Sequence, residues 1–147
     1  MIERTQIGRH AIWTEDDGLV CLLQNGVFVE AEATRMAELI AAHAETTVPG
    51  EPYFVLADWR AATGVTNEAR KVLATGDGRR EDMFVAAFGA SFAFRVVANL
   101  VISAMMLLNR SKVVASFKAN EEEARAWLGE KKATYLARKR EGATSSR

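Results

Sequence analysis

The chain of 147 residues is poor in the residue types that mark the most recognisable sites, with one cysteine, two histidines and two prolines. A single cysteine, Cys21, excludes an internal disulfide, and its place in the apolar run of residues 19–23 predicts a buried, inert thiol. His10 and His43 lie far apart, and neither has a cysteine, histidine or acidic residue at a recognised metal-ligand spacing. The sequence therefore predicts no metal site, no cofactor and no cysteine-based catalysis.

No charge of one sign predominates. Lysine and arginine total 19, aspartate and glutamate total 19, and the formal net charge is zero, so no global field draws the chain to nucleic acid or to an acidic membrane. The three tryptophans are not interleaved with basic residues, as a platform for single-stranded nucleic acid requires. The amino terminus has no apolar segment of the kind that a secretory signal needs. We therefore expect a cytoplasmic protein without a nucleic-acid partner.

One long hydrophobic run stands out, at residues 91–109. It is apolar on nearly every side except for a narrow stripe of Ser91, Arg95, Asn99 and Ser103. A surface helix needs only one apolar face, so something else must bury the rest of this one. The run is near the lower length limit for a membrane span and has Arg95 and Asn99 in its interior, so we expect no membrane insertion.

The remaining patterns alternate between strand and helix. The expected strands are residues 10–14, 18–24, 53–58, 83–88 and 113–118, and the expected helices are residues 30–44, 66–74, 91–109 and a last helix that starts at Asn120. The first two strands form a hairpin that ends at residues 25–26. This order favours an α/β fold with a sheet of about five mainly parallel strands and about four helices. We expect one domain over residues 1–141 and a disordered tail over residues 142–147.

Four segments carry a family resemblance. They are the opening hairpin, Tyr-Phe-Val-Leu-Ala-Asp at 53–58, Gly-Ala-Ser at 89–91 with Arg-Val-Val at 95–97, and Asn-Glu-Glu-Glu-Ala-Arg-Ala-Trp-Leu at 120–128. With them, the chain resembles a SpoIIAA-like protein over about residues 8–128. These proteins form the branch of the STAS superfamily related to anti-sigma factor antagonists. The resemblance implies a STAS-like fold in a bacterial protein and says little about activity, because the family is functionally heterogeneous and many members lack an assigned role.

A phosphorylation site is the one specific feature that the superfamily suggests. In phosphorylated antagonists, the loop after the strand that corresponds to residues 53–58 resembles Asp-Ser-Ser-Gly and presents a serine to a partner kinase. Here residues 58–65, which we interpret as that loop, contain no serine. Thr63 or Thr66 can in principle accept a phosphate, but both are better explained as turn and cap residues. Thr63 stays a weak candidate phosphoacceptor.

Polar residues follow the predicted parallel strands, at the edge where ligands bind open sheets of this kind. Asp58 and Arg60 end one strand, Ser91 starts the helix after the next strand, and Arg95 lies one turn further along that helix. The free amides at the helix start and the two arginines can hold a carboxylate or a phosphate. The alternative, which we favour, is that Asp58 pairs with Arg60 or Arg95 and that Ser91 only caps the helix.

The long apolar helix supports three hypotheses. It can wall a cavity for an apolar ligand, pack beneath the last helix, or form a homodimer interface through Arg95, Asn99, Leu100, Ser103, Met105 and Met106. The leading interpretation is a non-enzymatic binding or regulatory module that works through protein association. One alternative is a carrier of a fatty acid or other small amphiphilic anion, with the head group held by Arg95 or Arg60. The least favoured is a small-molecule enzyme that uses Asp58 with Arg60 and Ser91.

Overall fold

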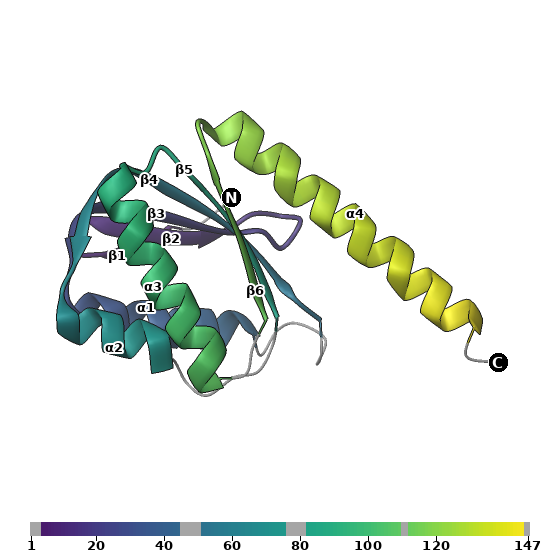
Figure 1. Ribbon diagram of the computed structural model, residues 1–147, viewed down its shortest axis with the longest axis horizontal. Coiled ribbons are helices and arrows are strands. Elements are labelled where there is room, and N and C mark those ends of the chain that lie inside the picture. Colours follow the sequence, from purple (N-terminus) through teal and green to yellow (C-terminus); the bar gives the residue numbers. More distant parts are fainter. Residues whose placement is uncertain (1–3, 45–50, 76–81, 110–111, 146–147) are drawn as a thin grey trace.

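The computed structural model describes residues 4–44, 51–75, 82–109 and 112–145 (Figure 1). Its strands are β1 (Thr5–Ile7), β2 (His10–Thr14), β3 (Val20–Phe28), β4 (Tyr53–Val65), β5 (Met83–Phe88) and β6 (Val113–Lys118). Its helices are α1 (Glu30–Ala44), α2 (Asn67–Thr75), α3 (Phe92–Asn109) and α4 (Glu121–Ser145). Strands and helices therefore alternate along the chain after β3, as the sequence predicts.

The six strands form one sheet, in the order β1-β2-β3-β4-β5-β6. The strands from β1 to β3 pair antiparallel, and those from β3 to β6 pair parallel. The α/β class and the mainly parallel sheet are confirmed, but the expected number of strands is corrected from five to six. The additional strand, β1, has three residues, which is too short for an alternating pattern to reveal it. It folds back onto β2 through Gly8, whose φ of +61° favours glycine.

β3 and β4 extend well beyond their predicted ends. β3 continues to Phe28 and β4 to Val65, so the hairpin end expected at residues 25–26 and the loop expected at residues 58–65 are both wrong. Register shifts in the pairing of the two strands accommodate the turn-like residues within them. Gly26, with a φ of +80°, lies at one of these shifts, so a residue that commonly marks a turn forms part of a bulge here.

Side-chain caps fix the starts of three helices at the predicted residues. The side-chain oxygen of each cap accepts a hydrogen bond from the backbone amide three residues further on, at 3.2 Å for Thr66, 3.2 Å for Ser91 and 2.9 Å for Asn120. At the start of α4, the Glu123 carboxylate also accepts from the Ala119 amide at 3.4 Å. These caps explain why the helix starts could be predicted closely from the sequence.

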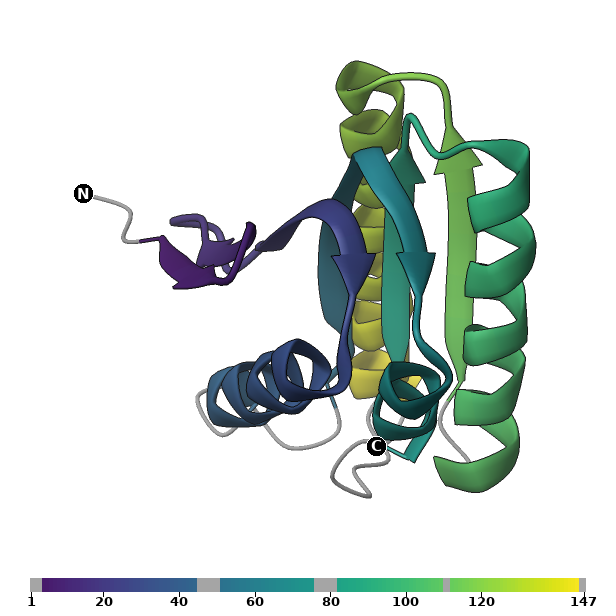
Figure 2. The ribbon, with the colours of Figure 1, turned by 90° about the vertical axis from the view of Figure 1, so that its left-hand side faces the viewer.

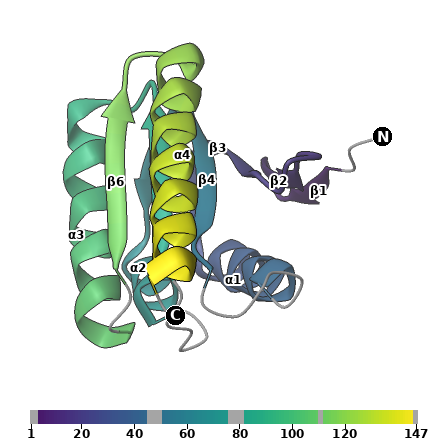
Figure 3. The ribbon, with the colours of Figure 1, turned by 90° about the vertical axis from the view of Figure 1, so that its right-hand side faces the viewer.

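The helices divide between the two faces of the sheet. α1, α2 and α3 lie against one face, and α4 runs along the other (Figures 2 and 3). The larger core cluster lies beneath α1, α2 and α3 and includes Val55 and Val85 of the sheet. A smaller cluster beneath α4 includes Leu56 and Phe88. Neighbouring residues of one strand thus belong to different cores, as strand geometry requires.

α4 is longer than the sequence indicates. It runs through Gly142 to Ser145, where the sequence predicts a disordered tail, because the preceding turns are rich in residues that favour helix. Lys139 on its outer half pairs with Glu51. The rest of the expected tail, residues 146–147, lies outside the described residues. Over the part of the chain that the structure describes, no helix has both the length and the apolar character needed to cross a membrane.

Candidate functional site

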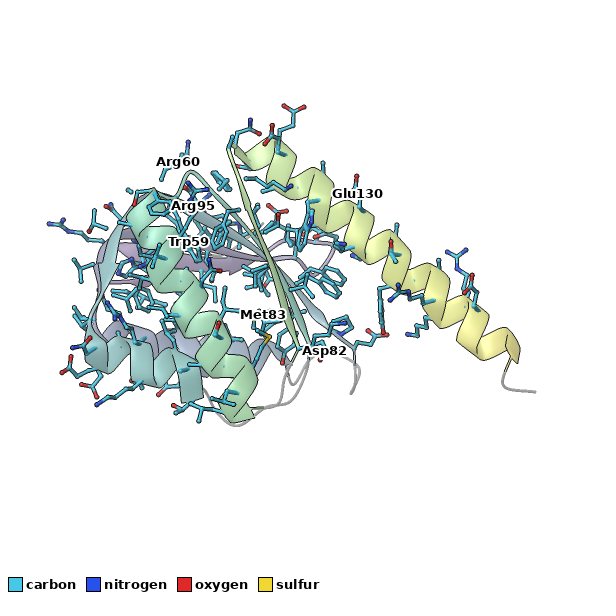
Figure 4. All side chains as sticks on the ribbon, in the orientation of Figure 1. Trp59, Arg60, Asp82, Met83, Arg95 and Glu130 are labelled. Atoms are coloured by element: carbon cyan, nitrogen blue, oxygen red, sulfur yellow. The ribbon has the colours of Figure 1, made fainter. Side chains whose placement is uncertain are left out.

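The residues of the predicted anion site lie near one end of the molecule but on different faces of the sheet. Figure 4 shows Trp59, Arg60 and Arg95 at that end. Because β4 continues as a strand, its alternation places Asp58 and Arg60 on the α4 side, where both line a cleft. Trp59 lies on the opposite side and packs against Phe94 of α3, with 5.0 Å between the ring centroids. The predicted set of residues is therefore split between two sites.

Asp58 and Arg60 form a bidentate ion pair. Arg60 donates from Nε to Asp58 Oδ1 at 3.0 Å and from Nη2 to Oδ2 at 2.7 Å, and its backbone amide donates to Oδ1 at 3.1 Å. Burial alone raises the pKa of the Asp58 carboxyl, but the hydrogen bonds and charge of Arg60 together hold that pKa below its usual value. This is the local pairing that the sequence analysis sets against an anion site.

Ser91 and Arg95 lie apart from that ion pair. The Ser91 hydroxyl caps α3 by accepting from the Phe94 amide at 3.2 Å. Arg95 is exposed, and its Cζ lies 5.9 Å from the centroid of the Phe92 ring on the same helix. Both side chains thus make their described contacts within the first turns of α3.

Thr63, the weak candidate phosphoacceptor, is exposed and lies within β4. It is therefore part of a strand, and the turn role expected for it is wrong. Thr66 caps α2, as expected. Phosphorylation of Thr63 stays a prediction.

A polar cleft of about 550 Å³ lies between the first hairpin, the sheet and the start of α4. The Arg125 guanidinium donates from Nη1 and Nη2 to the two Glu15 carboxylate oxygens at 2.8 Å each, and from Nε to Glu121 at 2.8 Å. The bonds from Arg125 hold the pKa of Glu15 below its usual value. Arg4 lies over the Trp13 ring, with Cζ 4.0 Å from its centroid. Sequence reasoning missed this cluster because Glu15 and Arg125 are 110 residues apart.

Cys21 is the thiol that lines this cleft. It is buried, and burial, followed by the charge of Glu15, raises its pKa to about 12. The thiol is therefore protonated at neutral pH and is a poor nucleophile. Glu15 and Asp58, two carboxylates of the cleft, are held by arginines. The cleft is thus better suited to holding charged groups together than to covalent chemistry.

A second unpredicted cluster centres on His10, which is 1% exposed. Its Nδ1 accepts a hydrogen bond from the Asn25 amide at 3.0 Å, and its Nε2 donates to Glu32 Oε1 at 3.0 Å. The same Glu32 oxygen accepts from the Val29 amide at 3.1 Å. Because Nδ1 accepts the bond from Asn25, the ring proton that reaches Glu32 lies on Nε2. His10 therefore ties β2 to the bulged part of β3 and to α1.

α3 presents apolar side chains on two faces. Its inner face, turned toward the sheet, is formed by Phe94, Ala98, Val101, Ile102 and Met105. Its outer face is formed by Phe92 (75% exposed), Val96 (45%), Leu100 (59%) and Leu107 (82%). Within each set, each residue lies three, four or seven positions from another member, which places the members of each set on one side of a helix.

Five of the six residues expected at an interface are exposed on α3, namely Arg95, Asn99, Leu100, Ser103 and Met106. The sixth, Met105, is corrected. It is partly buried and packs against the larger core, because it follows Val101 by one turn on the inner face.

An apolar cavity of about 220 Å³ lies between the inner face of α3, the other two helices of that layer and the sheet. Hydrocarbon side chains form most of its walls, and the side chains with a polar atom are Gln24 of β3 and Tyr53 and Trp59 of β4, among the described residues. Neither Arg60 nor Arg95, expected to hold a head group, lines it. One helix thus has a partly open apolar cavity on its inner face and an exposed apolar surface on its outer face.

Metal binding has little support in the described residues, where no three histidine, cysteine, aspartate or glutamate side chains gather in a way that could hold an ion.

The comparisons with known proteins concern the fold. No family model matches the chain, and no curated protein matches it. A solved structure from Shewanella loihica, described as an uncharacterized protein of the DUF3478 family with a SpoIIAA-like fold, is similar with a TM-score of 0.54 and 14% identity. The match covers 87% of this chain and 92% of that one, which confirms that this chain has the SpoIIAA-like fold predicted from its sequence.

Proposed function

We propose that this protein is a non-enzymatic binding and regulatory module that works by association in the bacterial cytoplasm, and that it forms a homodimer through the outer face of α3. The observation that carries the proposal is the row of four exposed apolar side chains on a helix whose other face is already buried. Single exposed apolar residues are common on monomers, whereas a continuous patch is typical of a binding surface.

The order of residues along the outer face fits a self-complementary pairing. In an antiparallel pair of α3 helices centred between Asn99 and Leu100, Phe92 of one copy lies opposite Leu107 of the second copy. Arg95 of one copy then lies near Ser103 of the second, where the two polar side chains can bond. The two Arg95 side chains are separated by about 13 Å along the helix axis. A parallel pair brings these like charges together, so we propose the antiparallel arrangement.

The contacts of the candidate catalytic residues support a role without chemistry. Asp58 and Arg60 are held in an ion pair with each other, and Ser91 caps a helix. Cys21, which is not one of these candidates, is a buried thiol with a raised pKa. An enzyme that used these groups has to break the contacts that hold them.

Light scattering during size-exclusion chromatography tests the dimer. We expect a dimeric mass for the wild-type protein and a monomeric mass for Leu100→Arg, because the new charge lies at the centre of the proposed contact. Leu136→Arg is the matched control, because Leu136 is an exposed apolar residue on α4, at the other face of the sheet. Met105→Glu is unsuitable, since it places a charge in the core. A monomeric wild type, or a Leu100→Arg protein that stays dimeric, contradicts the proposal.

A second candidate function, carriage of a small ligand, is favoured by the apolar cavity beneath α3. The cavity offers the apolar wall that the carrier hypothesis requires. Native mass spectrometry of the freshly purified protein tests it, with an added small mass as the expected result. A protein of unmodified mass that also shows no rise in melting temperature with any member of a panel of small apolar compounds contradicts carriage.

A further inference from the structure

We propose that the apolar cavity binds a small uncharged molecule that carries one hydrogen-bond acceptor, and that the side-chain amide of Gln24 donates to that acceptor. The inference rests on the second candidate function, carriage, and names the chemical class of the molecule carried. It differs from the fatty acid or amphiphilic anion expected from the sequence.

The lining of the cavity excludes a charged group. None of the described side chains that line it is charged, so a carboxylate that enters it gives up water without gaining a positively charged partner. Arg60 forms an ion pair with Asp58 on the α4 side of the sheet, opposite the cavity. Arg95 is exposed and contacts Phe92, which belongs to the outer face of α3. The cavity therefore favours a neutral molecule.

Gln24 supplies the polar contact. Its Nε2 is buried and has no hydrogen-bond acceptor among the residues that the structure describes. Gln24 lies where the register of β3 and β4 shifts, between Leu23 and Asn25, and it lines the cavity. A buried donor without a partner is rare in folded proteins, because it loses its bond to water without a replacement. Nε2 is itself covered, so the Gln24 side chain has to turn toward the cavity for a ligand oxygen there to provide the missing acceptor.

The volume sets the size of the molecule. Benzene fits an apolar cavity of about 150 Å³, so in proportion a cavity of about 220 Å³ takes about nine non-hydrogen atoms. A long-chain fatty acid is about twice that size. Compact ketones, esters or ethers of aromatic or branched hydrocarbons meet both the size and the acceptor requirement.

Three probes of equal size and nearly equal shape test separately the need for a hydrogen-bond acceptor and the exclusion of a charged group. Acetophenone has a carbonyl acceptor, α-methylstyrene replaces the carbonyl oxygen with a methylene group, and benzoate replaces the methyl ketone with a carboxylate. We would titrate each into the full-length protein and measure affinity by calorimetry. We would also follow the Gln24 side-chain NH₂ signals by NMR with ¹⁵N-labelled protein. We expect acetophenone to bind about fivefold more tightly than α-methylstyrene, to shift the Gln24 signals, and benzoate not to bind.

Three variants test whether the preference for acetophenone over α-methylstyrene comes from Gln24 and whether both probes bind in the cavity. Gln24→Leu removes the unpaired donor at similar volume, so it should fold as well as the wild type and should bind acetophenone and α-methylstyrene equally. Ala98→Leu fills the cavity from α3 and should abolish binding of both. Ala93→Leu, the matched control, adds the same side chain at an exposed position of α3 and should change neither affinity.

The outcomes distinguish the inference from the function on which it rests. If α-methylstyrene binds and acetophenone binds no better, or if Gln24→Leu keeps the acetophenone preference, the role of Gln24 is wrong while carriage stands. If benzoate binds most tightly, the inferred neutral class is wrong. If none of the three probes binds, both the inference and carriage of molecules of this size are overturned.

Discussion

Replacement of His10 by alanine should be among the most destabilising substitutions in this protein. The imidazole is 1% exposed and makes one hydrogen bond to Asn25 and one to Glu32, each of 3.0 Å. Its ring also packs against Phe28, with 4.6 Å between the ring centroids. His10→Ala removes both hydrogen bonds and leaves a cavity between β2, β3 and α1.

The magnitude follows from these contacts. Each lost hydrogen bond costs about 0.5 to 1.5 kcal/mol, and truncation of a buried ring adds a packing loss of about 2 kcal/mol or more. We therefore expect the free energy of unfolding to fall by about 4 kcal/mol. That is a large share of the roughly 5 to 15 kcal/mol that stabilises an ordinary domain. The melting temperature should fall by about 10 °C.

Urea unfolding, followed by the fluorescence of the three tryptophans, measures this loss. Glu32→Gln is the first control, because its amide oxygen can still accept from His10, and it should cost about 1 kcal/mol or less. Arg35→Ala, at an exposed position of α1, should change stability by less than about 0.5 kcal/mol. A His10→Ala protein within about 1 kcal/mol of the wild type refutes the reasoning.

Three further predictions test other contacts. Gly89 has a φ of +75°, and a Cβ there lies 2.3 Å from Arg60 Cγ, so Gly89→Ala should destabilise the fold by about 1 to 3 kcal/mol in thermal denaturation. Burial raises the pKa of Asp58, but its bonds to Arg60 prevail and lower it. The pair therefore adds stability above about pH 4 that is lost as the pH falls through the lower folded-state pKa. Asp58→Asn should make urea midpoints less sensitive to acid over that range, and unchanged sensitivity contradicts this account. Cys21, with its pKa raised to about 12, should resist a thiol reagent at about pH 8 until urea unfolds the protein.

The sequence predicts the regularly paired strands better than the bulged ones. The β5 and β6 strands have the predicted bounds, because each is an apolar run with polar or turn residues on both sides. The ends of β3 and β4 were not predictable in this way, since Gly26 and the residues after Asp58 look like turn sequence. Only the pairing of the two strands, which depends on residues far apart in the sequence, turns these segments into bulged strand.

In the candidate site, too, the residues with local contacts could be predicted from the sequence and the tertiary contacts could not. The sequence identified Asp58, Arg60 and Ser91, but their local contacts occupy them. Helical spacing could have placed Met105 on the inner face of α3, because it repeats with Ala98 and Val101. The Glu15 and Arg125 pair and the buried Gln24 amide, which has no acceptor among the described residues, depend on tertiary contacts, for which one sequence contains no periodic signal.

The two faces of α3 make the two proposed activities separable. Leu100 and Val101 are neighbours in the sequence, yet Leu100 is 59% exposed and Val101 is 9% exposed and lines the cavity. Leu100→Arg should therefore dissociate the dimer with acetophenone affinity unchanged, and Ala98→Leu should abolish acetophenone binding with the dimeric mass unchanged. If each variant instead alters both properties, the position of α3 couples the cavity to the interface. Linkage then requires that acetophenone shift the monomer–dimer equilibrium by the same factor as dimerisation shifts acetophenone affinity, which sedimentation at several acetophenone concentrations measures directly.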